Sequence, residues 1–287
     1  MANNINFGKI YDSTWWGVGV TSNNINWGKS YLDLAGGGGF DADYQAVLDY
    51  ATAQGYTLPS SGQQTLQNQL VVDLKDGGIW SKLDTFAVFA TDGDSDFALI
   101  DWKRLTDYTA VNSPAFTSNQ GFQGNATSSY INTNFNLDVN KVNYALNSAS
   151  IGVYDLNNQS GNFIFGAAES VTIRTSGNWN STTNKFTRIN DGSSGFPSTN
   201  ITNNGFVMVN RTSSSNLQIY DNGILHQQST ITSNDTPNQN LFLMAFNNEG
   251  SAILHSNSKL SIAFVGSDLS AEVSSINTAF NTYISVL

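Results

Sequence analysis

The feature that most constrains the fold is a series of short apolar runs, separated by turn-forming residues, that begins near residue 86. The runs lie at Phe86–Phe89, Tyr130–Asn132, Ala149–Tyr154, Asn162–Gly166, Ser170–Arg174, Thr187–Asn190, Gly205–Asn210, Leu217–Tyr220, Leu241–Phe246 and Lys259–Val265. Many short strands with frequent turns are typical of an antiparallel β-sandwich or jelly roll. Asp221-Asn222-Gly223 separates two apolar runs, and Asn-Gly readily adopts the positive φ angles of a tight hairpin turn. We therefore expect a mainly β protein with a hairpin at this point.

The polar composition agrees with this expectation and excludes several classes of function. Only 12% of the residues are charged, and three of them are glutamates, whereas helix-rich proteins usually carry more Glu and Lys. The formal net charge of −10 leaves no basic surface for phosphates, so we expect neither a nucleic-acid nor a membrane partner. The absence of cysteine removes disulfides, thiol nucleophiles and thiolate-bound metals. Met1–Gly8 lacks the pattern of a signal peptide, and no run of 18 apolar residues predicts a membrane span.

The first segment contains an internal repeat, because the pattern of Asn4–Tyr11 recurs at Asn24–Tyr31. This segment is too short to bury its own aromatic side chains, which must therefore pack against another surface. That surface is either the rest of this chain or a neighbouring subunit, and the sequence leaves both open. In the second case the attachment residues are Phe7, Tyr11, Trp15, Trp16, Trp27 and Tyr31. The four glycines of Gly36–Gly39 then indicate a hinge or linker.

Helical spacing of apolar residues appears in three places. It is found at Tyr44, Val47, Leu48 and Ala51 behind the N-cap candidate Asp41, at Leu66, Leu70 and Leu74 after Ser60-Ser61, and at Val273, Ile276, Phe280 and Tyr283 after Ser267–Ser270. Gly77-Gly78 predicts the end of the second helix. We therefore divide the chain into an N-terminal attachment arm (1–39), a small helical hairpin (40–78) and a β-sandwich with a C-terminal helix (79–287).

Several sequence blocks in the second part of the chain occur in one recognisable order. They are Gly78–Asp84, Ala98–Lys103, Phe116 with Gly121–Asn125, Ser128–Ile131, Asn147–Tyr154, Ile219–Gly223, and Leu260–Gly266 with Leu269-Ser270. Together they make Gly78–Leu287 resemble phage and prophage structural proteins that carry a concanavalin-like, laminin-G-like domain. The resemblance implies an antiparallel sandwich of that type and a non-enzymatic role in the virion, as a head fibre, decoration or tail protein. Fold alone does not determine function.

The same resemblance implies partners for the chain. Other virion structural proteins would contact it, self-association is expected, with a trimer as one form, and Asn4–Leu34 is similar to the arms by which phage fibres attach. The alternative within this fold is a receptor-recognition module that binds a host-surface glycan. Trp179 is a residue that would stack on a sugar ring in that case, although packing in a core or turn is the more ordinary role of a single tryptophan.

The residues offer little support for catalysis. His226 and His255 are the only histidines, and no Gly-x-Ser-x-Gly motif accompanies them. A concanavalin-like glycosidase, the third hypothesis, needs paired carboxylates, but its Glu-x-Asp-x-Glu strand motif is absent and Glu169, Glu249 and Glu272 lie far apart in sequence. We therefore expect no enzyme activity and no cofactor.

One acidic turn resembles the start of a calcium loop. Asp92, Asp94 and Asp96 alternate with Gly93 and Ser95, as the first carboxylates of such a loop do. No glutamate completes the loop six residues after Asp96, and position 97 is phenylalanine. The sequence therefore favours a polar turn over a metal site.

Overall fold

The computed structural model describes residues 39–157, 162–178, 187–192, 201 and 204–287. The chain divides into two compact units, Met1–Phe40 and Asp41–Leu287. The repeat at Asn4–Tyr11 and the six predicted attachment residues lie outside the described residues. The second unit contains every helix and strand of the described part of the chain.

Two helices open this unit, where the spacing of apolar residues predicted them. Helix α3 (Ala42–Gln54) begins after Asp41, whose side chain accepts a hydrogen bond from the Asp43 amide, and ends at Gly55 with φ of 80°. Helix α4 (Ser61–Asp76) begins after Ser60, whose hydroxyl caps the Gln63 amide. Short polar side chains satisfy amides that have no partner in the first turn, which is why both helices start there. The predicted N-caps are therefore confirmed.

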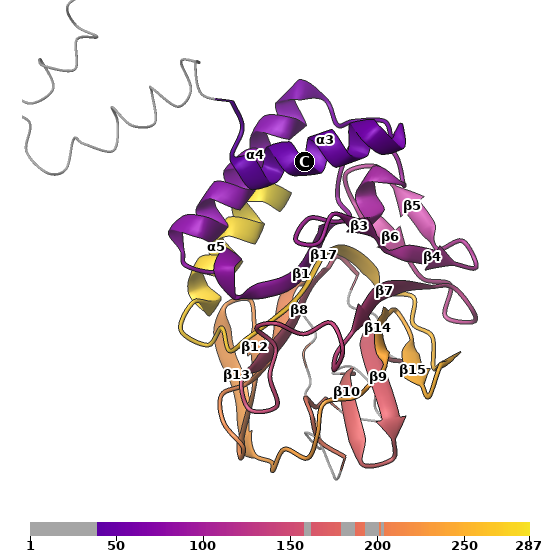
Figure 1. Cartoon of the computed structure of the whole chain (residues 1–287), viewed down its shortest axis with the longest axis vertical. Helices are drawn as coiled ribbons and strands as arrows, with labels where there is room; N and C mark the ends of the chain where they lie inside the picture. The colour runs from indigo at the N-terminus through magenta and orange to yellow at the C-terminus, as the bar shows by residue number, and fades with distance from the viewer. Residues whose placement is uncertain (1–38, 158–161, 179–186, 193–200, 202–203) are drawn as a thin grey trace, which may run out of the picture. The chain divides into compact units, whose positions relative to one another are not determined.

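Two sheets form the rest of the unit, which is mainly β and built as a sandwich (Figure 1); their strands pair antiparallel except for the parallel pair of β15 and β9. The eight-stranded sheet has the order β13 (Ile224–Thr230), β12 (Asn216–Asp221), β11 (Gly205–Arg211), β8 (Ala149–Asp155), β17 (Lys259–Gly266), β6 (Gly121–Gln123) and β5 (Ala115–Thr117), with β1 (Leu83–Val88) also beside β17. The seven-stranded sheet has the order β16 (Ser251–Ile253), β15 (Phe246–Asn248), β9 (Phe165–Ser170), β14 (Asn240–Leu243), β7 (Tyr130–Asn136) and β4 (Thr109–Val111), with β10 (Ile173–Gly177) also beside β9.

Smaller elements complete the unit. These are the hairpin of β2 (Ile100–Asp101) and β3 (Thr106–Asp107), the 3₁₀ turns η2 (Trp80–Lys82) and η3 (Phe97–Leu99), and helix α5 (Val273–Ile284). No described helix has the length and apolarity that crossing a membrane requires.

Several predicted runs need correction. Ser170–Arg174 is not one strand, because Ser170 ends β9 and Ile173 begins β10 after a turn. Leu241–Phe246 is split between β14 and β15, and Met244, with a φ of 62°, lies in the break between them. Thr187–Asn190 contributes only an isolated bridge between Arg188 and Ser176.

The tight hairpin was predicted correctly. Strands β12 and β13 pair antiparallel, and between them Asn222 and Gly223 have φ angles of 48° and 81°. Two consecutive positive φ angles are what a type I′ turn requires.

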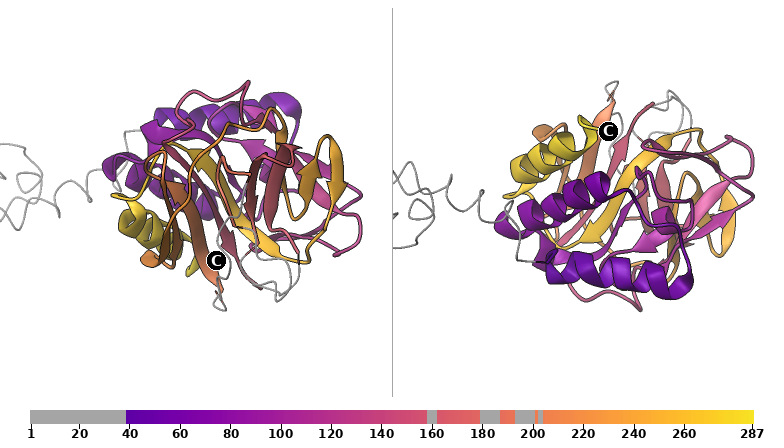
Figure 2. Two further views of the ribbon diagram at one scale, coloured as in Figure 1. Left: turned by 90° about the horizontal axis from the view of Figure 1, so that it is seen from below. Right: turned by 90° about the horizontal axis from the view of Figure 1, so that it is seen from above.

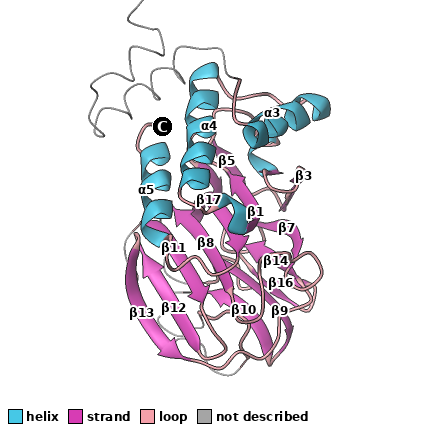
Figure 3. Cartoon of the chain, turned by 60° about the vertical axis from the view of Figure 1, so that its left-hand side comes forward, coloured by secondary structure: helices cyan, strands magenta, loops and turns pink. Residues whose placement is uncertain are grey.

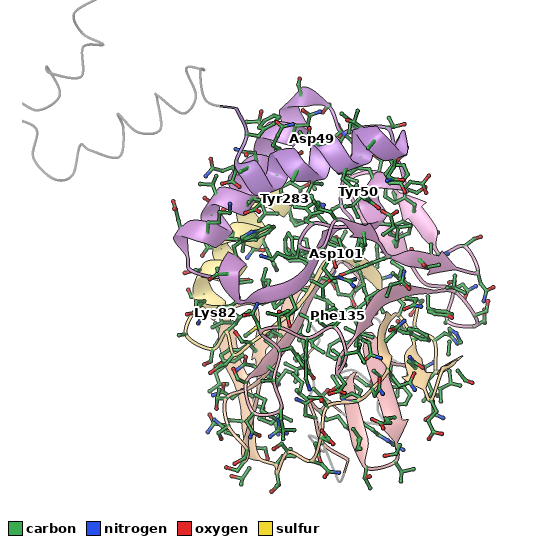
Figure 4. The ribbon with its side chains drawn as sticks, in the orientation of Figure 1. Asp49, Tyr50, Lys82, Asp101, Phe135 and Tyr283 are labelled. Atoms are coloured by element: carbon green, nitrogen blue, oxygen red, sulfur yellow. The ribbon has the colours of Figure 1, made fainter. Side chains whose placement is uncertain are left out.

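The main core fills the space between the two sheets (Figure 4 labels Phe135 there). Alternate residues of each strand face this space, for example Ile151 and Val153 of β8 opposite Phe165 and Ala167 of β9, and all four are fully buried. Apolar burial of this kind is the dominant stabilising term in folding.

A layer of helices covers the outer face of the eight-stranded sheet, as Figures 2 and 3 show. Phe280 of α5 lies 5.3 Å from Phe206, 6.0 Å from Phe264 and 6.2 Å from Phe86, measured between ring centroids, and these partners point outward from three strands. The arrangement closes a second apolar layer above the sandwich.

A polar network ties the same helices to the sheet. The fully buried Gln67 of α4 accepts a hydrogen bond from the Tyr44 hydroxyl (2.7 Å) and donates to the Tyr283 hydroxyl of α5 (3.1 Å), which donates to the Ala90 carbonyl (2.6 Å). Buried polar groups are tolerated when they are satisfied in this way.

Candidate functional site

The strongest candidate site is a hollow on the outer face of the seven-stranded sheet. It lies at the end of the sheet formed by β9, β10, β15 and β16, strands that are labelled between Figures 1 and 3. Its volume is about 240 Å³. Four apolar side chains, Phe163, Phe246, Ile253 and Leu254, and four polar ones, Arg174, Ser176, Arg188 and Asn248, line it. We call it the outer hollow.

The hollow exists because β9 presents small residues on this face. Phe165 and Ala167 point into the main core, so the alternation of a strand turns Gly166 and Ala168 outward. A Cβ atom on Gly166 would lie 2.3 Å from Cδ2 of Phe246, so glycine lets that ring lie directly on the strand. The small side chains leave room that larger ones would fill.

Two phenylalanines form the floor of the hollow. The rings of Phe163 and Phe246 lie 4.8 Å apart at 39°, and with Ala168 they form a cluster separate from the main core. Both side chains are 5% exposed, while Ile253 and Leu254 at the rim are 38% and 41% exposed. Apolar surface is thus offered to solvent on a face that no described helix covers.

Two arginines line the outer hollow on the side formed by β10. Arg174 lies on β10, and its Nε donates to the Ser170 carbonyl at 3.1 Å. Arg188 is 3% exposed, and its backbone exchanges hydrogen bonds of 2.8 and 2.9 Å with Ser176. Burial lowers the pKa of Arg188 to about 10; the negative charge of Asp191 opposes this shift and the positive charge of Arg174 adds to it. Arg188 therefore stays protonated at neutral pH.

A larger hollow lies between the end of α4 and α5, with a volume of about 440 Å³. Asp73, Asp76, Ser274, Ser275 and Thr278 are its main polar lining residues. It has no aromatic or basic side chain in its lining. Of its two carboxylates, that of Asp73 accepts a hydrogen bond from Gln69 at 2.8 Å and Asp76 is exposed. We consider it a surface groove between two helices.

The acidic turn at Asp92–Asp96 has a structural use. Asp92 accepts the Ser60 amide at 2.9 Å, and Asp94 accepts the amides of Thr57 and Phe97 at 2.7 and 2.8 Å. These bonds fasten the turn between α3 and α4 to the sandwich. Within the described ranges, no three His, Asp or Glu side chains gather in a way that would hold a metal ion.

The residues considered for catalysis lie on separate elements. His226 is exposed on β13, and His255 follows β16, where burial lowers its pKa and its ring lies 5.9 Å from that of Tyr130. Glu169 on β9 accepts the Asn238 amide at 3.0 Å, and Glu249 occupies the turn between β15 and β16.

Two further carboxylates are held in ion pairs. Glu272, at the N-cap of α5, has a side chain that is 18% exposed and pairs with Lys82 at 2.7 Å. Asp101, labelled in Figure 4, is fully buried and accepts Arg104 Nε at 2.5 Å.

Sequence reasoning did not find the outer hollow, and the residues it did propose remain without a structural description. The six attachment residues and Trp179 lie outside the described part of the chain. The hollow takes its residues from five separate segments, none of which carries a motif. The one available signal was the strand sequence Phe165–Ala168, in which small residues replace the usual outward polar ones.

No protein-family model matches the sequence, and neither does any curated protein. Similar solved structures include domain 4 of AbnA, a GH43 extracellular arabinanase from Geobacillus stearothermophilus, in complex with arabinotriose (15% identity, TM-score 0.38, covering 68% of this chain and 98% of that one). They also include a mutant Trypanosoma rangeli sialidase displaying trans-sialidase activity (11%, TM-score 0.44, 78% and 40%) and the receptor-binding domain of botulinum neurotoxin C/D mosaic serotype (12%, TM-score 0.41, 70% and 52%). The chain thus spans about two fifths of the sialidase and about half of the neurotoxin domain. At these identities and TM-scores, the similarities carry no conclusion about what this chain binds.

Proposed function

We propose that this chain is a non-catalytic, sugar-binding β-sandwich of the concanavalin-like, laminin-G-like type, and that the outer hollow is its binding site. The observation that carries the proposal is the aromatic floor of Phe163 and Phe246 on an uncovered sheet face, flanked by polar side chains. Sugars combine apolar C–H faces with hydroxyl groups, so they suit a concave site with aromatic surface and a few placed hydrogen-bonding groups. Ser176 and Asn248 supply such groups.

The size of the hollow limits the ligand. Its volume of about 240 Å³ is below the roughly 300–1,000 Å³ of pockets that enclose drug-sized molecules. One sugar unit at the end or side of a longer glycan fits this limit. The non-catalytic part of the proposal is supported by Glu169 and Glu272, both of which have structural partners.

A glycan array probed with the full chain tests the proposal. We expect binding that is lost in Phe246→Ala, since the floor then disappears, while Tyr220→Phe on the other sheet keeps it. Thermal unfolding of each variant must show a folded protein. Absence of binding to every glycan would remove the proposal, and release of reducing ends from a bound polysaccharide would replace it with a hydrolase.

We also propose that the chain is a structural component of a bacteriophage virion, present as a homo-oligomer and anchored through its N-terminal arm. Two observations support this role: the sequence blocks that resemble phage structural proteins, and the separation of Met1–Phe40, with its aromatic repeat, from the sandwich unit. Mass spectrometry of purified particles, with and without deletion of Met1–Leu34, tests it. Loss of the protein on deletion is expected. Absence of the full-length protein from particles would overturn the virion role and leave the sugar-binding proposal standing.

A further inference from the structure

We infer that the sugar bound in the outer hollow carries a carboxylate, which lies against Arg174 and Arg188 while the ring lies over Phe163 and Phe246. This inference rests on the proposed function and specifies its ligand class. Uronic acids and other acidic sugars belong to this class.

The distribution of charge is the first argument. The chain has a net charge of −10 and only four arginines, yet two of them line this one small hollow. None of the hollow's lining residues is a carboxylate. If the charges of the hollow served only solubility, we would expect them to be mainly negative, as in the rest of the chain. The local excess of positive charge therefore favours an anionic ligand.

The energetics of Arg188 give the second argument. Desolvation lowers its pKa, and the nearby positive charge of Arg174 lowers it further, so each guanidinium makes the other less favourable. Asp191 offsets part of this effect. A ligand carboxylate placed beside both guanidiniums would act in the same favourable direction as Asp191.

The register of the strands gives the third argument. Arg174 and Ser176 are two residues apart on β10 and so point to the same face, and Arg188 lies opposite Ser176 across the bridge. Side chains directly opposite on paired strands have Cβ atoms about 5 Å apart. Arg174, Ser176 and Arg188 therefore project from neighbouring positions on one face of the sheet and line the same hollow. Planar guanidiniums donate two parallel hydrogen bonds to a carboxylate, which a spherical charge cannot match.

The position of the aromatic floor then sets the orientation of the ligand. Phe163 precedes β9 and Phe246 begins β15, so the floor lies beside the arginines and not beneath them. An acidic sugar can present its carboxylate toward β10 and its C–H face to the two rings. A free inorganic anion would use only the arginines and leave the floor uncovered.

Calorimetry with matched sugars tests the inference on the full chain. The ligands are oligogalacturonate with its carboxyl-reduced galactan, and sialyllactose with lactose. We expect an acidic member to bind at least about tenfold more tightly than its neutral counterpart, since charge-assisted hydrogen bonds are the stronger ones. Equal affinity for both members would overturn the inference and leave sugar binding intact. No binding of any member would remove the proposed function as well.

Variants locate the effect. Arg174→Gln should bring the ratio of acidic to neutral affinity close to one, and Arg174→Lys should retain part of it, because charge remains without the bidentate geometry. Lys259→Gln is the matched control, since it removes one positive charge from the eight-stranded sheet, where Lys259 contacts Gln120 at 2.7 Å. An equal loss in Lys259→Gln would show that overall charge causes the preference, which overturns the assigned site. Arg174 is chosen in place of the buried Arg188 because it is only half-buried, so its replacement should disturb the fold less.

Discussion

The outer faces of the two sheets both carry outward-pointing phenylalanines, but they differ in what covers these rings. Each presents outward-pointing phenylalanines beside a glycine on a central strand, Gly152 on β8 beneath Phe264 and Gly166 on β9 beneath Phe246. On the eight-stranded sheet, α5 places Phe280 against these rings and closes the layer. On the seven-stranded sheet no described helix follows, and the rings border a hollow with two arginines.

The difference shows what outward aromatic residues mean in a sandwich. Such residues need a cover, because exposed apolar surface is unfavourable in water. Where the chain supplies the cover, the residues contribute to stability. Where it does not, we propose that they mark a place for a ligand. Matched substitutions on the two faces test whether they differ in this respect.

Removal of the Phe280 ring should have the largest effect. Phe280→Ala empties the centre of the helix-covered layer, and such changes in a well-packed core destabilise by about 3–5 kcal/mol. The equivalent change on the other face, Phe163→Ala, should cost roughly half as much, because that ring already borders unfilled space. Urea unfolding measures both. Equal losses would mean that the hollow's floor is ordinary core.

The two glycines separate stability from binding. Gly152→Ala places a Cβ 2.4 Å from Cε1 and Cζ of Phe264 beneath the helical layer, so we expect a loss of about 1–3 kcal/mol from overpacking. Gly166→Ala pushes Phe246 into the hollow, which has room for it, so stability should change by less than about 1 kcal/mol.

The two glycine substitutions should affect sugar affinity in the opposite order to stability. Sugar affinity should be lost in Gly166→Ala and kept in Gly152→Ala. Calorimetric titration of the two folded variants reads this out, and the reverse pattern would contradict the placement of the site.

The polar network makes a smaller, testable contribution to the helical layer. Tyr283→Phe leaves the Ala90 carbonyl and the Gln67 amide without their hydroxyl partner, at a cost of about 1–2 kcal/mol. Tyr130→Phe is the control on the seven-stranded sheet, because the Tyr130 hydroxyl has no hydrogen bond in the described part of the chain. Denaturant midpoints that move equally in both variants would contradict the role of the network.

Acid should loosen the helical layer first. The hydrogen bond from the Lys75 ammonium lowers the pKa of Asp43. For Asp94, burial acts to raise the pKa, but hydrogen bonds from the amides of Phe97 and Thr57 outweigh burial, so that the pKa of Asp94 is also lowered. Since both folded pKa values lie below 3.8, their contribution is present above that pH and is lost as the pH falls through the folded values. Hydrogen exchange between pH 5 and pH 2.5 should show α3 and the turn after it opening before the main core. Simultaneous opening of both would contradict this order.

Local features were predictable from the sequence, and long-range ones were not. Asp41, Ser60 and Asn222-Gly223 each fix a helix start or a turn through bonds within a few residues, so their patterns identified the elements. The outer hollow depends on β15 turning back at Met244 to run parallel to β9, which brings Phe246 onto Gly166. No short segment encodes that contact. Because Leu241–Phe246 was predicted as one strand, no turn was expected at Met244, and the contact between Phe246 and Gly166 was missed.

The pairing of β17 has a consequence for how the protein folds during synthesis. Strand β17, close to the C-terminus, lies between β8 on one side and β1 and β6 on the other, with Val265 opposite both Thr85 and Ile151. The middle of the larger sheet therefore stays incomplete until Lys259–Gly266 has left the ribosome. Contacts between such distant parts of a sequence form slowly. Chains that stop before Lys259 would expose the edges of β1 and β8, and their expected fate is aggregation and not a smaller folded domain.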